Sequence, residues 1–152
     1  MNTNASIPSK IKLLCETGID SFRVSLNSTQ KKFYEIYFKP LNYNFSDVLK
    51  SIEIAKKYKK FISINLFVFP GITDTEEEIK SLIKFIKNTG IDMIQWRNLN
   101  IDPDYYLENL ASLNSPSKGI FYLLKVIKKE FPCLKTGYFN LPKEKFYTSE
   151  KQ

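Results

Sequence analysis

The sequence contains no histidine, and its 152 residues include only two cysteines and two arginines. Histidine is the commonest general base and the commonest metal ligand, so its absence excludes histidine-based catalytic triads and histidine-ligated zinc sites. Cys15 and Cys133 lie 118 positions apart, which fits neither a disulfide framework nor a metal-binding motif. We interpret each cysteine as a small buried hydrophobic residue.

Long apolar runs and targeting signals are also missing. No apolar run approaches the roughly 20 residues that span a bilayer, and the first ten residues, MNTNASIPSK, lack the basic and apolar regions of a signal peptide. The composition, with 43% hydrophobic and 14% aromatic residues, argues against disorder, and the length suits one domain. We therefore expect a single cytoplasmic domain with no membrane partner.

Lysine dominates the basic residues, accounting for 21 of the 23. Pairs such as Lys56-Lys57 and Lys128-Lys129 fall on polar faces or in last turns of predicted helices, where the helix dipole favours cations. The net charge of +7 is compatible with nucleic-acid binding, but the scattered lysines favour a solvated surface. We expect no nucleic-acid partner, and a basic nucleic-acid-binding module stays open as an alternative.

The stretch FISINLFVF, residues 61–69, gives the clearest secondary-structure signal. Its β-branched and aromatic side chains predict a strand, with Ile64 and Leu66 on one face and Ser63 and Asn65 on the other. A strand without a solvated face is typical of a parallel sheet covered by helices. Ser63 and Asn65 would then be buried polar groups, which a bound ligand would explain.

The rest of the chain repeats this alternation of strand and helix. Thr17-Gly18-Ile19-Asp20 recurs as Thr89-Gly90-Ile91-Asp92, each time closing a helix and opening a strand. We predict strands at 19–27, 61–69, 91–99 and 134–139 and helices at 6–17, 29–38, 47–58, 73–90 and 117–131. The expected N-caps are Ser46 for helix 47–58, and Thr73 or Thr75, in capping boxes with Glu76 or Glu78, for helix 73–90.

Right-handed crossovers would make the predicted strands neighbours in one parallel sheet. The predicted fold class is α/β: an incomplete (β/α) barrel of about three to four βα units with parallel strands, because an eight-stranded barrel takes about 250 residues.

Polar side chains recur on the same face of each predicted strand: Ser21, Arg23, Ser25 and Asn27, then Ser63 and Asn65, then Gln95 and Arg97. Ordinary barrel interiors are packed with Val, Ile and Leu, so a polar interior indicates a binding site. Arginine presents a planar fork that matches a carboxylate or a phosphate. We expect an anionic ligand; the alternative is that each arginine pairs with an acid such as Asp102 or points outward at a barrel rim.

A carboxylate fits this interior better than a phosphate. Phosphate sites favour a glycine-rich loop and a helix N-terminus free of acids, whereas only Gly71 is near, and the helix after the central strand begins with Asp74, Glu76, Glu77 and Glu78. We interpret Asp74 as a helix cap; the alternative is that its carboxylate holds a hydroxyl or an amine.

Four segments resemble the second half of a radical SAM enzyme, over about residues 3–140. They are SFRVSLNS, KPLNYNFSDVLKSIEIAKK, ISINLFVFPGITDTEEEI and IDMIQWRNLNIDPDYY. The resemblance implies strands four to six of a partial (β/α)6 barrel within residues 1–142, followed by a frayed tail at 143–152. It also implies S-adenosylmethionine and a [4Fe-4S] cluster as cofactors of the full-length protein. The CxxxCxxC motif that holds the cluster is absent, so we expect this chain to bind no metal and to be inactive alone.

The resemblance also implies roles for the polar residues. By position, contacts to S-adenosylmethionine would come from Arg23, Ser25 and Asn27, from Asn65 and the Pro70-Gly71 turn, and from Arg97, Asn98 and Leu99. Substrate contacts would come from Asn100, Asp102 and the Tyr105-Tyr106 loop. The family's frequent GxIxGxxE pattern is matched poorly here, and we assign no catalytic residue.

The predicted function is therefore that of the C-terminal portion of a radical SAM protein, contributing cofactor and substrate contacts. A partner chain or a missing segment would carry the first half of the barrel. The alternative from another class is a non-catalytic α/β binding subunit. The strand at 19–27 would lack its upstream neighbour, and such an edge favours self-association.

Overall fold

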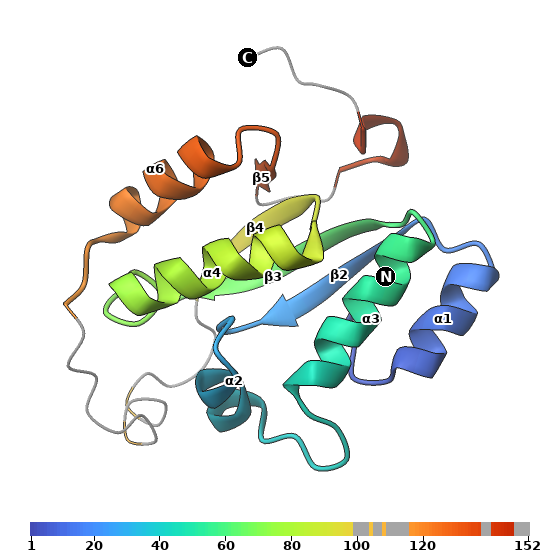
Figure 1. Ribbon diagram of the computed structural model, residues 1–152, viewed down its shortest axis with the longest axis horizontal. Coiled ribbons are helices and arrows are strands. Elements are labelled where there is room, and N and C mark those ends of the chain that lie inside the picture. Colours follow the sequence, from blue (N-terminus) through green and yellow to red (C-terminus); the bar gives the residue numbers. More distant parts are fainter. Residues whose placement is uncertain (99–103, 105–107, 109–115, 138–140, 148–152) are drawn as a thin grey trace.

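The computed structural model describes residues 1–98, 104, 108, 116–137 and 141–147, and its centre is a parallel sheet (Figure 1). The strands are β1 (Asn2–Thr3), β2 (Ser21–Leu26), β3 (Phe61–Val68), β4 (Met93–Asn98) and β5 (Lys135–Gly137). They lie side by side in chain order, and every pair is parallel. The predicted α/β class with a partial, barrel-like parallel sheet is confirmed.

Helices connect the strands and cover one face of the sheet (Figure 1). They are α1 (Pro8–Glu16), α2 (Lys31–Phe38), α3 (Phe45–Lys57), α4 (Glu76–Thr89) and α6 (Ile120–Glu130), followed by the short 3-10 helix η1 (Lys143–Lys145). Each predicted helix is present, with ends shifted by a few residues. Among the described residues, no helix combines the length and apolar character needed to cross a bilayer.

The caps of α3 and α4 refine the predicted helix starts. Asn44, not Ser46, caps α3: its side chain accepts from the Ser46 N–H, while the Asp47 carboxylate accepts from the Asn44 N–H. Thr75 caps α4 and accepts from the Glu78 N–H. The Glu78 carboxylate does not complete that capping box, because it is bound elsewhere. At the other end, Gly90 takes the left-handed conformation (φ 59°) that stops α4.

The apolar core lies between the sheet and the helices. Alternate residues of the three long strands point into it and are at most 2% exposed: Phe22, Val24 and Leu26, then Ile62, Ile64 and Leu66, then Ile94. They pack against apolar residues of α1, α3, α4 and α6. The other residues of these strands face away from the helices, and we call that side the inner face.

Two expectations about the chain's surface are wrong. The strand at 19–27 does not lack an upstream neighbour, because β1 pairs with it, in the register Asn2 with Arg23 and Thr3 with Val24. Cys15 is buried as expected, but Cys133 is exposed. It follows α6 rather than lying within it, so its side chain misses the core.

The segment after β5 packs under the inner face. Phe146 is buried and its ring stacks on Phe61, with centroids 4.2 Å apart, while Lys143 forms an ion pair with Asp20 at 2.6 Å. These contacts hold residues 141–147 against the amino-terminal ends of β2 and β3. The division into a domain at 1–142 and a frayed tail at 143–152 stays a prediction.

Candidate functional site

The polar residues of the inner face lie in register across neighbouring strands. Ser25, Asn65 and Gln95 form one row, because Ser25 pairs with Asn65 and Asn65 pairs with Gln95. Arg23 pairs with Ser63 in the row below, toward the amino-terminal ends of the strands. Polar side chains from three parallel strands therefore share one face of the sheet, as the sequence predicts.

Arg97 contacts two members of the row of Ser25, Asn65 and Gln95, which we call the upper row. Its Nη2 donates to Oε1 of Gln95 at 2.9 Å, and its Nε lies 3.4 Å from Oδ1 of Asn65. Two of the contacts that hold the guanidinium are thus to neutral amide groups, which help to fix its position. Asn98, the last residue of β4, is exposed beside it.

Arg23 has fewer partners than Arg97. Its Nε is buried and has no hydrogen-bond partner among the described residues. No ion pair between described residues includes it. Burial lowers the pKa of Arg23, and the neighbouring charge of Arg97 lowers it further. Two guanidinium groups therefore share one side of the sheet.

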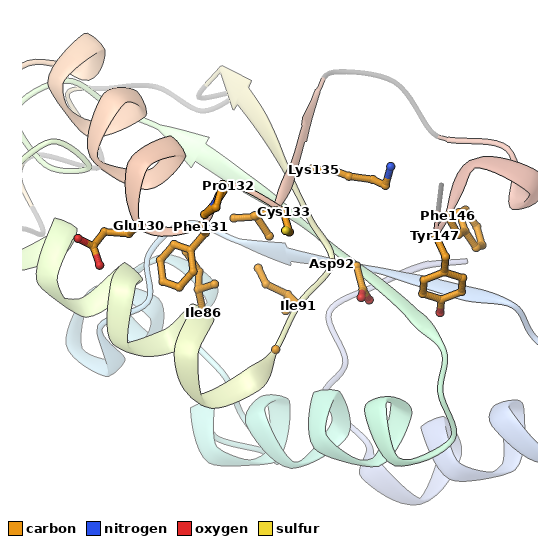
Figure 2. A pocket seen from close by; sticks show the side chains of 12 residues that line it. Ile86, Ile91, Asp92, Glu130, Phe131, Pro132, Cys133, Lys135, Phe146 and Tyr147 are labelled. Atoms are coloured by element: carbon orange, nitrogen blue, oxygen red, sulfur yellow. The ribbon is translucent and has the colours of Figure 1, made fainter. Parts of the chain in front are cut away.

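A small cavity, the inner hollow, lies beside Arg23. Its volume is about 200 Å³; Ser21, Arg23, Ser63 and Gln95 line it with polar groups, and Phe61 and Phe146 lie at its base. A larger pocket of about 690 Å³ lies elsewhere, beside the amino-terminal ends of β4 and β5 (Figure 2). Ile86, Ile91 and Phe131 gather there. Its two carboxylates are already paired, Asp92 with Lys56 at 2.8 Å and Glu130 with Lys87 at 3.8 Å. The smaller cavity is the one that contacts the polar inner face, through Arg23, Ser63 and Gln95.

Polar groups in the loops that follow β2 and β3 form hydrogen bonds within the chain. Asn27 is buried, and its Nδ2 donates to the Phe33 carbonyl at 2.8 Å. The Gly71 N–H donates to Oδ1 of Asp74 at 2.6 Å, and Pro70 is exposed beside it. These three predicted residues frame the carboxyl ends of the strands, and Asn27 and Gly71 already hold the loops in shape.

The Asp74 carboxylate stabilises the turn after β3 and also accepts a hydrogen bond from a hydroxyl group. Besides binding Gly71, its carboxylate accepts from the Ser117 hydroxyl at 2.6 Å, and its carbonyl accepts from the Lys118 N–H at 2.9 Å. The hydroxyl it holds thus belongs to the protein. Asp74 joins the turn after β3 to the segment that leads into α6.

Glu78 is a buried carboxylate whose contacts the sequence did not reveal. Both oxygens accept from the Ser28 hydroxyl, at 2.9 and 2.8 Å, and further donors are the Thr29 N–H at 2.8 Å and Gln30 Nε2 at 2.7 Å. Burial raises the pKa of Glu78, and the surrounding donors oppose that rise. Glu78 therefore fixes the loop after β2 to the first turn of α4.

The remaining predicted positions do not add to this site. Asn100 and Asp102, the predicted substrate contacts, lie outside the described residues, as do Leu99 and Tyr105-Tyr106. Among the described residues, no group of three or more His, Cys, Asp or Glu side chains could hold a metal ion. The described site is thus an amide, hydroxyl and guanidinium surface.

Four of the nine ion pairs between described residues join a lysine to an acid of the same helix. Exposed pairs four residues apart join Lys12 to Glu16, Lys31 to Glu35, Lys57 to Glu53 and Lys80 to Glu76. This arrangement is typical of a solvated helix surface. The absence of a nucleic-acid partner stays a prediction.

Comparison with solved structures finds the same fold in radical SAM proteins. A radical SAM methyltransferase from Sphaerobacter thermophilus superposes with a TM-score of 0.62 at 11% identity, over 91% of this chain and 39% of that chain. Streptococcus suis SuiB bound to S-adenosylmethionine gives 0.60 at 16% identity, over 96% and 34%. SuiB bound to its precursor peptide SuiA gives 0.57 at 16% identity, over 90% and 31%.

The chain spans between 31% and 39% of the length of these three structures. A search of curated protein sequences found no match. The family model described as the radical SAM superfamily matches residues 1–86, which is more than half of the chain. The chain belongs to the radical SAM superfamily.

Proposed function

We propose that this chain forms the C-terminal part of a radical SAM domain and contributes contacts to S-adenosylmethionine. The observation that carries the proposal is the polar row of Ser25, Asn65 and Gln95, bridged by Arg97 at the carboxyl ends of adjacent parallel strands. Ligands of open α/β sheets bind at these ends of the strands.

The residues of this row fit the chemistry of S-adenosylmethionine. Its ribose hydroxyls can donate to and accept from the side chains of Ser25 and Asn65, and its carboxylate suits the guanidinium of Arg97. Asn98 is exposed at the end of β4 and would border the ligand. Asn27 and Gly71 shape the surrounding loops, since both are bound within the chain.

The residues present do not fit the [4Fe-4S] cluster that the family uses together with S-adenosylmethionine. Thiolates hold such clusters, and the chain has two cysteines, one buried in α1 and one exposed after α6. Burial raises the pKa of Cys15, which disfavours the thiolate. We therefore assign the cluster ligands to another segment or a partner chain that carries the first half of the barrel, and derive no step through the cluster.

A binding measurement tests the cofactor proposal. Isothermal titration of the chain with S-adenosylmethionine should show binding that Asn65→Leu weakens by roughly tenfold, the loss expected for one or two hydrogen bonds. Asn88→Leu is the matched control, because Asn88 is an exposed residue of α4. Equal affinities for both variants and the unaltered chain would contradict the proposed site.

A second experiment tests where the cluster ligands lie. Reconstitution of the chain with iron and sulfide should give no stoichiometric cluster, as judged by its visible absorbance. Co-expression with a CxxxCxxC-bearing radical SAM segment should allow the two to purify together with a cluster. A stoichiometric cluster on the chain alone would overturn the assignment.

A further inference from the structure

Arg23, which the family resemblance placed among the S-adenosylmethionine contacts, occupies a different level of the inner face from Ser25 and Asn65. It pairs with Ser63, two residues before the row of Ser25 and Asn65, and β-strand residues two apart are separated by about 6.5 Å along the strand. Its side chain lines the inner hollow; of the row above, Gln95 also lines the hollow, whereas Ser25 and Asn65 do not. Arg23 therefore faces a space below the proposed cofactor contacts.

The charge of Arg23 is not neutralised by the acids nearest to it in the chain or in the neighbouring strands. Asp20, just before β2, pairs with Lys143, and Asp92, just before β4, pairs with Lys56. The charged side chain that lowers the pKa of Arg23, beside the effect of burial, is Arg97, another cation. Leaving a guanidinium Nε buried without a partner costs free energy. A bound anion would recover that cost.

We propose that Arg23 binds a carboxylate of the substrate in the inner hollow, an inference that rests on the proposed function of the upper row. The hollow, at about 200 Å³, has room for a short carboxylate-bearing chain. Its other polar groups are the neutral Ser21, Ser63 and Gln95, so selectivity for the anion depends on the Arg23 fork. The aromatic base of Phe61 and Phe146 suits the aliphatic part of such a group.

A carboxylate fits this hollow better than a phosphate. Phosphate sites usually draw on several backbone N–H groups at a helix N-terminus or glycine turn. The Arg23 N–H donates to the Met1 carbonyl at 2.7 Å, and the lining side chains come from strands and from the segment after β5.

The test uses glutarate as the carboxylate probe and glutaramide as its neutral counterpart. In heteronuclear NMR spectra of the whole chain, glutarate should shift the Arg23 Nε–H resonance, and glutaramide should not. Arg23→Met should weaken glutarate binding by roughly tenfold to a hundredfold, the loss expected for a charge-assisted bidentate contact. Arg23→Lys, which keeps the charge, should bind glutarate with an affinity between those of Arg23→Met and the unaltered chain. Lys84→Met, which removes an exposed charge from α4, should leave glutarate affinity unchanged.

A titration with S-adenosylmethionine separates the two sources of carboxylate. If Arg23 serves the substrate, Arg23→Met should bind S-adenosylmethionine as well as the unaltered chain, whereas Asn65→Leu should not. A tenfold loss of S-adenosylmethionine affinity in Arg23→Met, or no glutarate shift at Arg23, would overturn the inference. Failure of the proposed function has a different signature, because S-adenosylmethionine would then not bind the unaltered chain while glutarate still shifts Arg23.

Discussion

The two faces of the sheet carry different kinds of side chain although the same strands form them. On the helix-covered face, Val24, Ile64 and Ile94 are almost fully buried in apolar contacts. On the inner face, the same strands carry Arg23, Asn65 and Gln95, side chains that are costly to bury. The first face supplies the apolar core of the fold, and the second carries the proposed binding site.

Buried polar groups outside the inner face show that burial alone is not a mark of function. Glu78, at 2% exposed, is surrounded by donors from the loop after β2. Arg23 has a buried Nε without a hydrogen-bond partner among the described residues. A satisfied buried charge holds structure together, whereas an unsatisfied one indicates that a partner from outside the described chain is missing.

The largest expected effect contrasts two neighbours in β3. Ile64→Ala should lower the free energy of unfolding by about 3 to 4 kcal/mol, because it removes a fully buried side chain from the core. Asn65→Leu should change it by about 1 kcal/mol or less, since its one weak contact with Arg97 is lost and an apolar group is buried. Urea denaturation measures both. Comparable losses would remove the distinction between the two faces.

The next effect tests the satisfied buried charge. Glu78→Ala should cost about 2 to 3 kcal/mol, because the donors of Ser28, Thr29 and Gln30 lose their acceptor. Glu77→Ala, one residue earlier and exposed, should cost about 0.5 kcal/mol or less, as its pair with Lys32 is a surface ion pair. Urea denaturation of both variants under one condition is the measurement. Equal costs would show that the Glu78 contacts add nothing.

A smaller effect compares the two arginines. Arg97→Met should destabilise the chain by about 1 kcal/mol, because it leaves the buried Gln95 amide without this donor. Arg23→Met should be neutral or stabilising by about 1 kcal/mol, since it replaces a poorly satisfied charge with an apolar chain of similar length. Thermal unfolding gives the comparison. A loss for Arg23→Met as large as that for Arg97→Met would mean that Arg23 is satisfied after all.

The smallest effect is a pH dependence that Glu78 should produce. Because burial raises the pKa of Glu78 in the folded chain, the folded state holds its proton more tightly than the unfolded state. The stabilisation that protonated Glu78 gives the folded state is therefore complete below about pH 4.3, the usual pKa of glutamate. It is lost as the pH rises through the pKa of Glu78 in the folded chain. Relative to Glu78→Gln, the unaltered chain should lose stability as the pH rises. A gain over the same range would contradict the raised pKa.

Most of the fold could be predicted because short sequence patterns, such as alternating side chains and helix-ending glycines, specify its strands and helices. The alternation in FISINLFVF gives β3 and its two faces, and Gly90 ends α4 as its sequence suggests. The N-cap of α3 is Asn44 rather than the predicted Ser46; both residue types are good caps, and the contacts of Asn44 with the Ser46 N–H and with Asp47 distinguish them. The two-residue strand β1 carries no periodic signal, so pairing with β2 alone defines it.

The residue types of the site were predictable from the sequence, but the different contacts of its two arginines were not. The sequence indicated that the arginines share a face, and the register confirms it for Arg23 and Arg97. It could not show that neutral amides hold Arg97 while the Nε of Arg23 stays unsatisfied. Glu78 resembles Glu76 and Glu77 in sequence, and its role depends on Ser28, 50 positions away.

The most direct test of the central claim is an NMR titration of the chain with S-adenosylmethionine at millimolar concentration. If the upper row of the inner face holds the cofactor, the side-chain amides of Asn65 and Gln95 and the Nε–H of Arg97 should shift together with one dissociation constant. Residues of the large pocket, such as Ile91, should stay unchanged. Shifts confined to the helix-covered side or the large pocket, or no shifts at all, would contradict the account.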